Sequence, residues 1–160
     1  MVKHYAAKSF VSGNSIGSLA KMVHSLIHDC AGPIFADHDI TFVQWIALIK
    51  LREGAALTPG DLCRLMCHDT GAITRMIDQL EQLGYVMRAR SRQDRRVVSL
   101  TLTTAGQKKL GELTPLVVDR LNLILSDFSK TEFAELTRLM KKLVDSLQTV
   151  KAADALGNGP

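Results

Sequence analysis

Residues 58–103 constrain the fold more than any other part of the chain, because they place two short helical segments before two strand-like runs. The first segment, TPGDLCRLM, has Thr58 as a helix cap and Pro59 at the first helical position. The second, TGAITRMIDQLEQLG, repeats apolar residues at helical spacing and stops at Gly84. The runs YVMRARS and VVSLTLT then flank RQDRR, which is typical of a β-hairpin. This order predicts a winged helix-turn-helix.

The segments on both sides of this region are expected to be helical. Their apolar residues recur at three- and four-residue steps, so the fold class is mainly α with a small β-hairpin. The helices at 16–30, 106–125 and 129–147 carry more apolar surface than one small domain can cover, which gives a physical motive for dimerisation. We expect a helical dimerisation region at 1–36 and 104–150, a winged helix-turn-helix DNA-binding domain at 37–103, and a disordered tail at 151–160.

The positive charge is concentrated in the middle of the chain. Residues 61–110 hold nine Lys or Arg against five Asp or Glu, and the remainder is balanced, so this segment accounts for the whole formal charge of +4. A local surplus of this kind indicates a polyanionic partner. Charge runs are often only solvated surface, but a basic hairpin behind two short helices favours double-stranded DNA.

The second helix of the pair is expected to read the DNA. A helix fits the major groove, and the exposed residues of its N-terminal half reach base edges. Thr70, Thr74 and Arg75 are placed for this contact, and Gly71 lets the backbone approach closely. The helix N-terminus also favours a nearby phosphate. The alternative is that these are ordinary exposed residues of a helix.

The hairpin is expected to be the wing. Its basic residues are candidates for contact with DNA: Arg88, Arg90, Arg92, Arg95 and Arg96. A narrow minor groove attracts an inserted arginine, and phosphate contacts make affinity depend steeply on salt. Asp94 lies two residues before Arg96, so we expect its carboxylate to hold that guanidinium towards the DNA.

These residues resemble the MarR family (multiple-antibiotic-resistance regulators) of bacterial transcription factors. The resemblance extends over about 19–147 and includes DITFVQWIALIKL, DLCRLMCHDTGAITRMIDQLEQLGYVMR and the wing signature DRRVVSLTLTTAG. The run T-R-x-x-D-x-L falls at Thr74, Arg75, Asp78 and Leu80. The chain departs from the family at Gly71-Ala72, where Ser or Thr is usual, and this puts the target DNA sequence in doubt.

The resemblance implies a function and an assembly. Family members are homodimers whose N- and C-terminal helices interlock and hold two winged domains against a pseudo-palindromic operator. Most are repressors, and many release operator DNA when a small aromatic or anionic effector binds between the dimer and DNA-binding regions. Two alternatives stay open: a constitutive or architectural DNA-binding protein without an effector, and a cysteine-based redox-sensing regulator.

Histidines, a tryptophan and cysteines are candidates for other sites. His24, His28 and Trp45 are candidates for an effector pocket, with surface histidines and a core tryptophan as the alternative. Three cysteines are an odd number, which argues against a disulfide framework. Cys63 and Cys67 lie one helical turn apart but lack the second ligand pair of a structural zinc site. Packing is therefore favoured over metal binding or redox sensing, for Cys30 as well.

Several classes of protein have no support in the sequence. No nucleophile–base grouping or phosphate-binding loop is present, so we expect no enzyme, no cofactor and no metal. No apolar run approaches the roughly 20 residues that a membrane span needs. The N-terminus lacks the pattern of a secretory signal. We therefore expect a cytoplasmic protein with no membrane partner.

Overall fold

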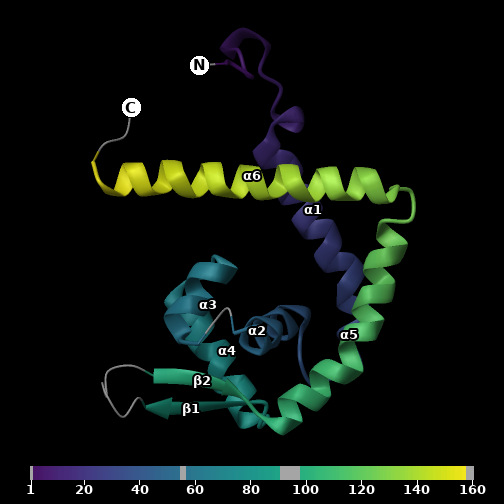
Figure 1. Ribbon diagram of the computed structural model, residues 1–160, viewed down its shortest axis with the longest axis vertical. Helices are drawn as coiled ribbons and strands as arrows, with labels where there is room; N and C mark the ends of the chain where they lie inside the picture. Colours follow the sequence, from purple (N-terminus) through teal and green to yellow (C-terminus); the bar gives the residue numbers. More distant parts are fainter. Residues whose placement is uncertain (1, 55–56, 91–97, 158–160) are drawn as a thin grey trace. The chain divides into compact units, whose positions relative to one another are not determined.

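The structure is a computed structural model, and it describes residues 2–54, 57–90 and 98–157 (Figure 1). These residues form helices and one two-stranded antiparallel sheet, as the sequence predicts. The elements are η1 (Ala7–Ser9), η2 (Ser12–Asn14), α1 (Ile16–Ala31), η3 (Gly32–Phe35), α2 (Phe42–Arg52), α3 (Pro59–Met66), α4 (Thr70–Gln82), β1 (Val86–Arg90), β2 (Val98–Leu102), α5 (Thr104–Ile124) and α6 (Lys130–Ala155).

The helices begin where the sequence supplies an acceptor for their free N–H groups. Thr58 starts α3 in a reciprocal capping box with Asp61, with Pro59 at the first helical position. The Asp69 carboxylate accepts from the N–H of Ala72 at the start of α4 (2.9 Å). At the other end of α4, Gly84 takes a φ of +74°, which a side chain would disfavour. These caps place both helices of the predicted pair within a residue or two of their expected bounds.

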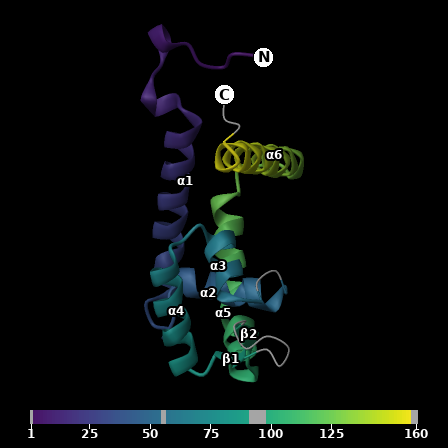
Figure 2. The same cartoon turned by 90° about the vertical axis from the view of Figure 1, so that its left-hand side faces the viewer.

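The chain separates into two compact units, Met1–Val118 and Asp119–Pro160. In the first unit, α2, α3, α4 and the hairpin pack together (Figures 1 and 2). Their buried side chains include Leu48, Leu62, Ile73, Ile77, Leu80, Val86 and Leu100, joined by Leu110, Leu113 and Val117 of α5. This division differs from the boundaries at 36 and 104 because the first turns of α5 belong to the core of the first unit. The functional boundaries stay a prediction.

The hairpin is joined to the segments that precede and follow it. Its strands pair from Val86↔Leu102 to Arg90↔Val98. The N–H of Leu100 also donates to the carbonyl oxygen of Leu57 (2.8 Å), which ties β2 to the segment before α3. After β2, the Thr103 hydroxyl accepts from the N–H of Gly106 (3.0 Å) and so caps α5. The wing base is therefore continuous with the start of α5.

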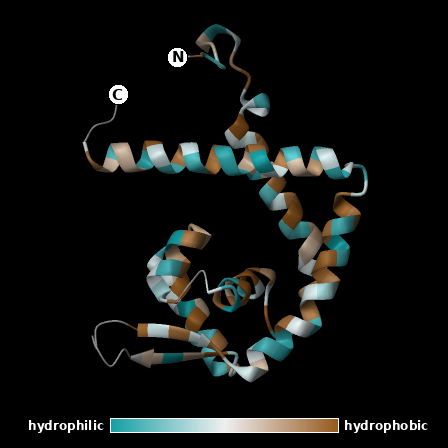
Figure 3. Cartoon of the chain, in the orientation of Figure 1, coloured by the Kyte–Doolittle hydropathy of each residue, from teal (hydrophilic) through white to brown (hydrophobic). Residues whose placement is uncertain are grey.

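The second unit contains α6, which begins at a capping box of Ser129 and Glu132. The expectation of a disordered tail over 151–160 is wrong for 151–155, which are helical. Lys151, Ala152, Ala153 and Ala155 are strong helix formers, and the helix ends at Ala155, two residues before Gly157 with its φ of +71°. Apolar side chains recur along this helix and, separately, along α1 (Figure 3).

Candidate nucleic-acid interface

The helix-turn-helix consists of α3, a short turn and α4. The two helices pack against each other, and Leu62 of α3 and Ile73 and Ile77 of α4 are almost fully buried. Between them Cys67 adopts the left-handed conformation, with a φ of 54°, which turns the chain within three residues. Because one face of α4 is fixed in this core, its other face is presented in a defined orientation.

The exposed face of α4 carries the residues that the sequence assigned to the major groove. Thr70, Gly71, Thr74 and Arg75 are all exposed. The Thr74 hydroxyl donates to the carbonyl oxygen of Thr70 (2.8 Å), which restricts its side chain while leaving the oxygen able to accept. The N–H of Ala72 lowers the pKa of Asp69, and the charge of Arg75 contributes to the same shift. An ionised cap and a nearby guanidinium therefore stand at the exposed start of the helix.

Arg88 has partners within the protein. Its guanidinium bonds to Asp78 (Nη2–Oδ1, 2.5 Å) and to Glu81 (Nη1–Oε2, 2.7 Å), both on α4. The hydrogen bond to Asp78 raises the pKa of Arg88, so the charge is permanent. The sequence placed Arg88 with the DNA-contacting arginines, whereas the structure shows it joining β1 to α4. Contact between Arg88 and DNA stays a prediction.

The tip of the wing lies outside the described residues. This segment includes Arg92, Asp94, Arg95 and Arg96, so the predicted pair of Asp94 and Arg96 stays a prediction. For Arg90 the described feature is its backbone pairing with Val98.

Three residues far apart in the sequence meet at the base of the wing. The Tyr85 hydroxyl donates to Asp39 Oδ2 (2.6 Å), and Lys109 Nζ lies 3.0 Å from Asp39 Oδ1. The same ammonium lies 5.6 Å from the centroid of the Tyr85 ring, within range of a cation–π contact. The Tyr85 hydrogen bond is the main cause that lowers the pKa of Asp39. This cluster joins the segment before α2, the start of β1 and the first turns of α5.

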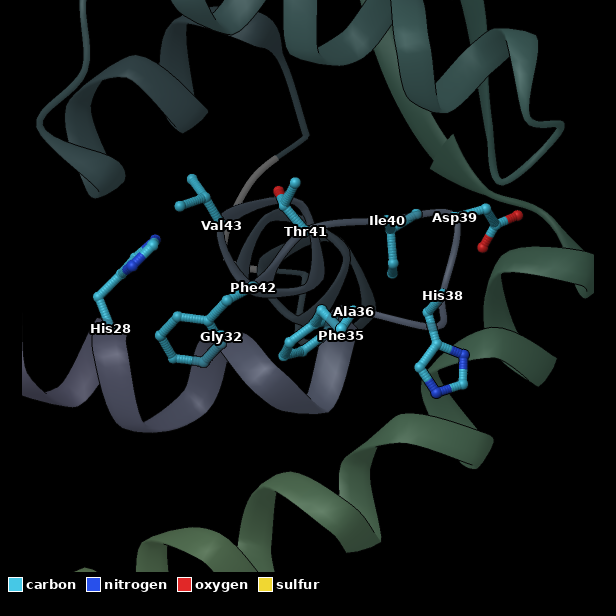
Figure 4. Close-up of a pocket in the computed structure, with 10 residues that line it drawn as sticks. All are labelled: His28, Gly32, Phe35, Ala36, His38, Asp39, Ile40, Thr41, Phe42 and Val43. Carbon is cyan, nitrogen blue, oxygen red and sulfur yellow. The ribbon is translucent and has the colours of Figure 1, made fainter.

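A cavity of about 440 Å³ lies beside this cluster, between the end of α1 and the start of α2. Figure 4 shows Phe35 and Phe42 at its centre, with His28 at one end and His38 and Asp39 at the other. Its lining residues are His28, Gly32, Phe35, Ala36, His38, Asp39, Ile40, Thr41, Phe42 and Val43.

The three pocket candidates from the sequence have different places. His28 lines the cavity, and its ring centroid lies 6.0 Å from that of Phe42. Trp45 is not among the lining residues but stacks on Phe42, with 5.8 Å between ring centroids. His24 is exposed on α1 and is absent from the lining. Of the three candidates, His28 lines the cavity, and Trp45 contacts the lining residue Phe42.

Other chemistry has little basis in the part of the chain that the structure describes. Cys30, Cys63 and Cys67 are free thiols there, with Cys30 and Cys67 exposed. Within 2–54, 57–90 and 98–157, no group of three or more His, Cys, Asp or Glu could hold a metal ion. Across the same ranges, each helix is too short or too polar to span a bilayer.

Sequence reasoning missed several of these residues. Asp39, Tyr85 and Lys109 carry no local signal, because their meeting depends on the packing of three elements. The partners of Arg88 had a partial signal, since Asp78 and Glu81 are one turn apart on the polar face of α4. Gln44 forms a capping box with Thr41 at the start of α2, and the sequence pattern T-x-x-Q at 41–44 is a clear signal for it.

Comparison with known proteins agrees with this architecture. The model of the MarR family matches residues 40–98, which include α2, α3, α4 and β1. The multiple antibiotic resistance protein MarR of Escherichia coli (strain K12) is 32% identical over 139 residues, covering 82% of this chain and 94% of that protein. The organic hydroperoxide resistance transcriptional regulator of Bacillus subtilis (strain 168) is 32% identical over 118 residues, covering 74% and 77%.

A solved structure shares both the fold and a similar level of identity. It is a mutant MarR from E. coli complexed with operator DNA, with a TM-score of 0.73 and 31% identity. The match covers 84% of this chain and 99% of that one.

Proposed function

This chain belongs to the MarR family, and from that premise we propose that it is a transcriptional regulator that binds operator DNA through α4 and the wing. The observation that carries the proposal is the exposed N-terminal half of α4, held by a buried opposite face. A helix with this exposure can enter the major groove. The Bacillus subtilis relative is named as a transcriptional regulator, which supports a DNA-binding protein over an enzyme.

We propose two kinds of DNA contact, one to base edges and one to the minor groove and backbone phosphates. Thr70, Gly71, Thr74 and Arg75 approach the base edges, where Arg75 can pair with guanine or phosphate. The wing arginines contact the minor groove and backbone phosphates, with Asp94 orienting Arg96. The positive surplus of residues 61–110 supports this arrangement, because each neutralised phosphate releases a counterion.

We further propose that the regulator is a homodimer on a pseudo-palindromic site. Two separate parts of the chain expose many large apolar side chains, which a monomer would leave in water. In α1 these are Ile16, Leu19, Met22, Val23 and Leu26, and in α6 they are Phe133, Leu136, Leu139, Met140, Val144, Leu147 and Val150.

The third part of the proposal is repression relieved by a small effector. The cavity at the start of α2 is of a size suited to a small molecule, and it is lined by aromatic rings and two imidazoles. These groups favour a small aromatic ligand with an acidic or hydrogen-bonding group. Because Asp39 already binds Tyr85 and Lys109, its charge does not exclude an anion.

The test compares binding of the DNA upstream of the chain's own gene with binding of a scrambled duplex at fixed salt. Specific recognition predicts an affinity ratio of about 10³ or more. Arg96→Ala should weaken binding to both duplexes, whereas Thr74→Ala or Arg75→Ala should lower the ratio. Arg138→Ala, which removes an exposed arginine from α6, is the matched control. Equal affinities of the unchanged protein for the two duplexes would refute specific regulation.

A further inference from the structure

Gln44 is a polar side chain in a place where the chain otherwise buries apolar ones. It is 7% exposed, and it is the one polar residue among those that the structure describes as buried. Removing an amide from water is costly unless its hydrogen bonds are made inside the protein. A buried glutamine therefore needs a specific reason.

The capping box at the start of α2 accounts for the hydrogen bond of the Gln44 side-chain oxygen. Gln44 Oε1 accepts from the N–H of Thr41 (2.8 Å), and the Thr41 hydroxyl accepts from the N–H of Gln44 (3.2 Å). This box needs only an acceptor at its third position. The two other boxes described in this chain use acids there, Asp61 and Glu132.

The side-chain nitrogen of Gln44 makes a second hydrogen bond, to another helix. Gln44 Nε2 donates to Gln79 Oε1 of α4 (2.8 Å), a bond that joins residues 35 positions apart. A glutamate at 44 would cap α2 as well but would bring a buried charge and no amide donor. The choice of glutamine thus lets one side chain serve two helices.

Gln79 is placed to control the orientation of α4. It lies nine residues after Thr70, about 13 Å along the helix axis, so a tilt of about 10° at that point moves Thr70 by about 2 Å. Arg88 holds the neighbouring Asp78 and Glu81 from the side of β1. The C-terminal half of α4 is therefore held by β1 through Arg88 and by α2 through Gln44.

We propose that Gln44 is a positioning residue for DNA recognition, which sets α4 through Gln79 and connects it to the cavity-lining start of α2. Thr41 and Phe42 both line the cavity, and Thr41 shares its capping box with Gln44. A molecule that shifts Thr41 also shifts Gln44, because each residue bonds to the other. The hydrogen bond from Gln44 to Gln79 then changes as well. This inference rests on the proposed role of α4 in reading operator DNA.

The experiment alters the link from its exposed end, where folding is least at risk. Gln79→Ala removes the acceptor, and Gln79→Glu keeps an acceptor for Gln44 Nε2 at the same position. Gln82→Ala is the matched control, because it makes the same chemical change at an exposed residue of the same helix. For each variant the ratio of affinities for the chain's own upstream DNA and a scrambled duplex is measured at fixed salt, below the onset of thermal unfolding.

The expected result is that Gln79→Ala lowers this ratio three- to tenfold, while Gln79→Glu and Gln82→Ala keep it within about twofold. Gln79→Glu weakens binding to both duplexes by a similar factor, because its added charge repels phosphate without regard to sequence. An unchanged ratio for Gln79→Ala overturns the proposal. A fall in the ratio for Gln79→Glu as large as that for Gln79→Ala also overturns it. If the unchanged protein shows no preference between the duplexes, the failure belongs to the proposed function instead.

Discussion

Arg88 shows that a basic side chain in a segment predicted to bind DNA can have a structural role. It lies in the arginine-rich stretch that predicts the wing, yet its guanidinium is shared between Asp78 and Glu81. Its side chain is 28% exposed, less than either carboxylate. Composition and spacing cannot separate such an arginine from one that binds phosphate, because both belong to the same basic run.

Salt dependence should separate these two kinds of arginine. We expect Arg88→Gln to lower the free energy of unfolding by about 1 kcal/mol, because the ion pairs are partly exposed. Its DNA affinity should fall with an unchanged slope against the logarithm of salt concentration. Arg96→Ala, by contrast, should reduce the slope by about one. Affinities measured over a series of salt concentrations give both slopes, and a reduced slope for Arg88→Gln would assign Arg88 to phosphate after all.

The cluster of Asp39, Tyr85 and Lys109 makes a prediction about pH. The pKa of Asp39 is lowered in the folded protein, chiefly by the Tyr85 hydroxyl, so its contribution to stability is complete above its unfolded pKa of about 3.9. That contribution is lost as the pH falls through the lower, folded value. The pKa of Lys109 is raised, chiefly by Asp39, so its contribution is complete below about pH 10 and lost as the pH rises further.

Asp39→Asn tests this pH dependence. We expect the variant to be less stable than the unchanged protein near neutral pH and to approach its stability as the pH is lowered below about 4. Urea unfolding at several pH values measures the difference. A gap that stays constant into the acid range would show that the carboxylate charge contributes nothing at this site.

Among the helices, capping residues determine where each helix begins, and packing against neighbouring elements limits which side chains each helix can hold. Thr58 caps α3 as the sequence predicts, and the side chains of Asp69, Thr103 and Ser129 cap α4, α5 and α6 in the same way. Gly106 in the first turn of α5 is different, because its role depends on the neighbouring hairpin. A Cβ there would overlap the carbonyl oxygen of Tyr85 and lie 2.7 Å from Leu102 Cδ1.

Two glycines of α5 should therefore respond in opposite ways to alanine. Gly106→Ala is expected to lower the free energy of unfolding by about 2 kcal/mol or more, because α5 must move away from the wing base. Gly111→Ala has open space for its methyl group and should raise stability by about 0.5–1 kcal/mol, through the higher helix propensity of alanine. Thermal unfolding of both variants provides the comparison. Equal effects would contradict the close packing at Gly106.

At the scale of the whole molecule, the exposed apolar residues matter most. Neither α1 nor α6 hides its large apolar side chains in the described structure, and α6 contains no buried residue in the part that is described. Residues of this kind at helical spacing are typical of a surface that meets another protein surface. A second copy of the chain is the partner that our proposed function requires.

A charge on α6 should disturb this assembly. We expect Leu147→Glu to shift the protein from dimer towards monomer, because Leu147 is 61% exposed in the single chain and a carboxylate is costly in an apolar interface. Lys151→Glu introduces the same carboxylate one turn later on the same helix, in place of a charged residue. We expect this variant to remain a dimer. Sedimentation at several concentrations measures both. A monomeric unchanged protein would refute the dimer, and an unaffected Leu147→Glu would place the interface elsewhere.

Features that depend on neighbours within about four residues can be read from the amino-acid sequence alone. Apolar periodicity located the helices, while capping residues and glycines set their ends, because both act within one turn. The pattern of Thr58 to Thr103 also determined the winged helix-turn-helix and the exposed residues of α4. The extension of α6 to Ala155 follows from helix propensity, which is also a local property.

The hydrogen bonds and ion pairs between residues far apart in the sequence depend on how the folded chain packs. Gln44 bonds to Gln79 across 35 residues, Tyr85 bonds to Asp39 across 46, and Arg88 joins β1 to Asp78 of α4. These bonds form after the apolar core has brought the helices and the hairpin together, and no local pattern encodes them. Hydrogen bonds and ion pairs of this range depend on packing geometry, whereas helix periodicity and caps depend on the chain's own neighbours.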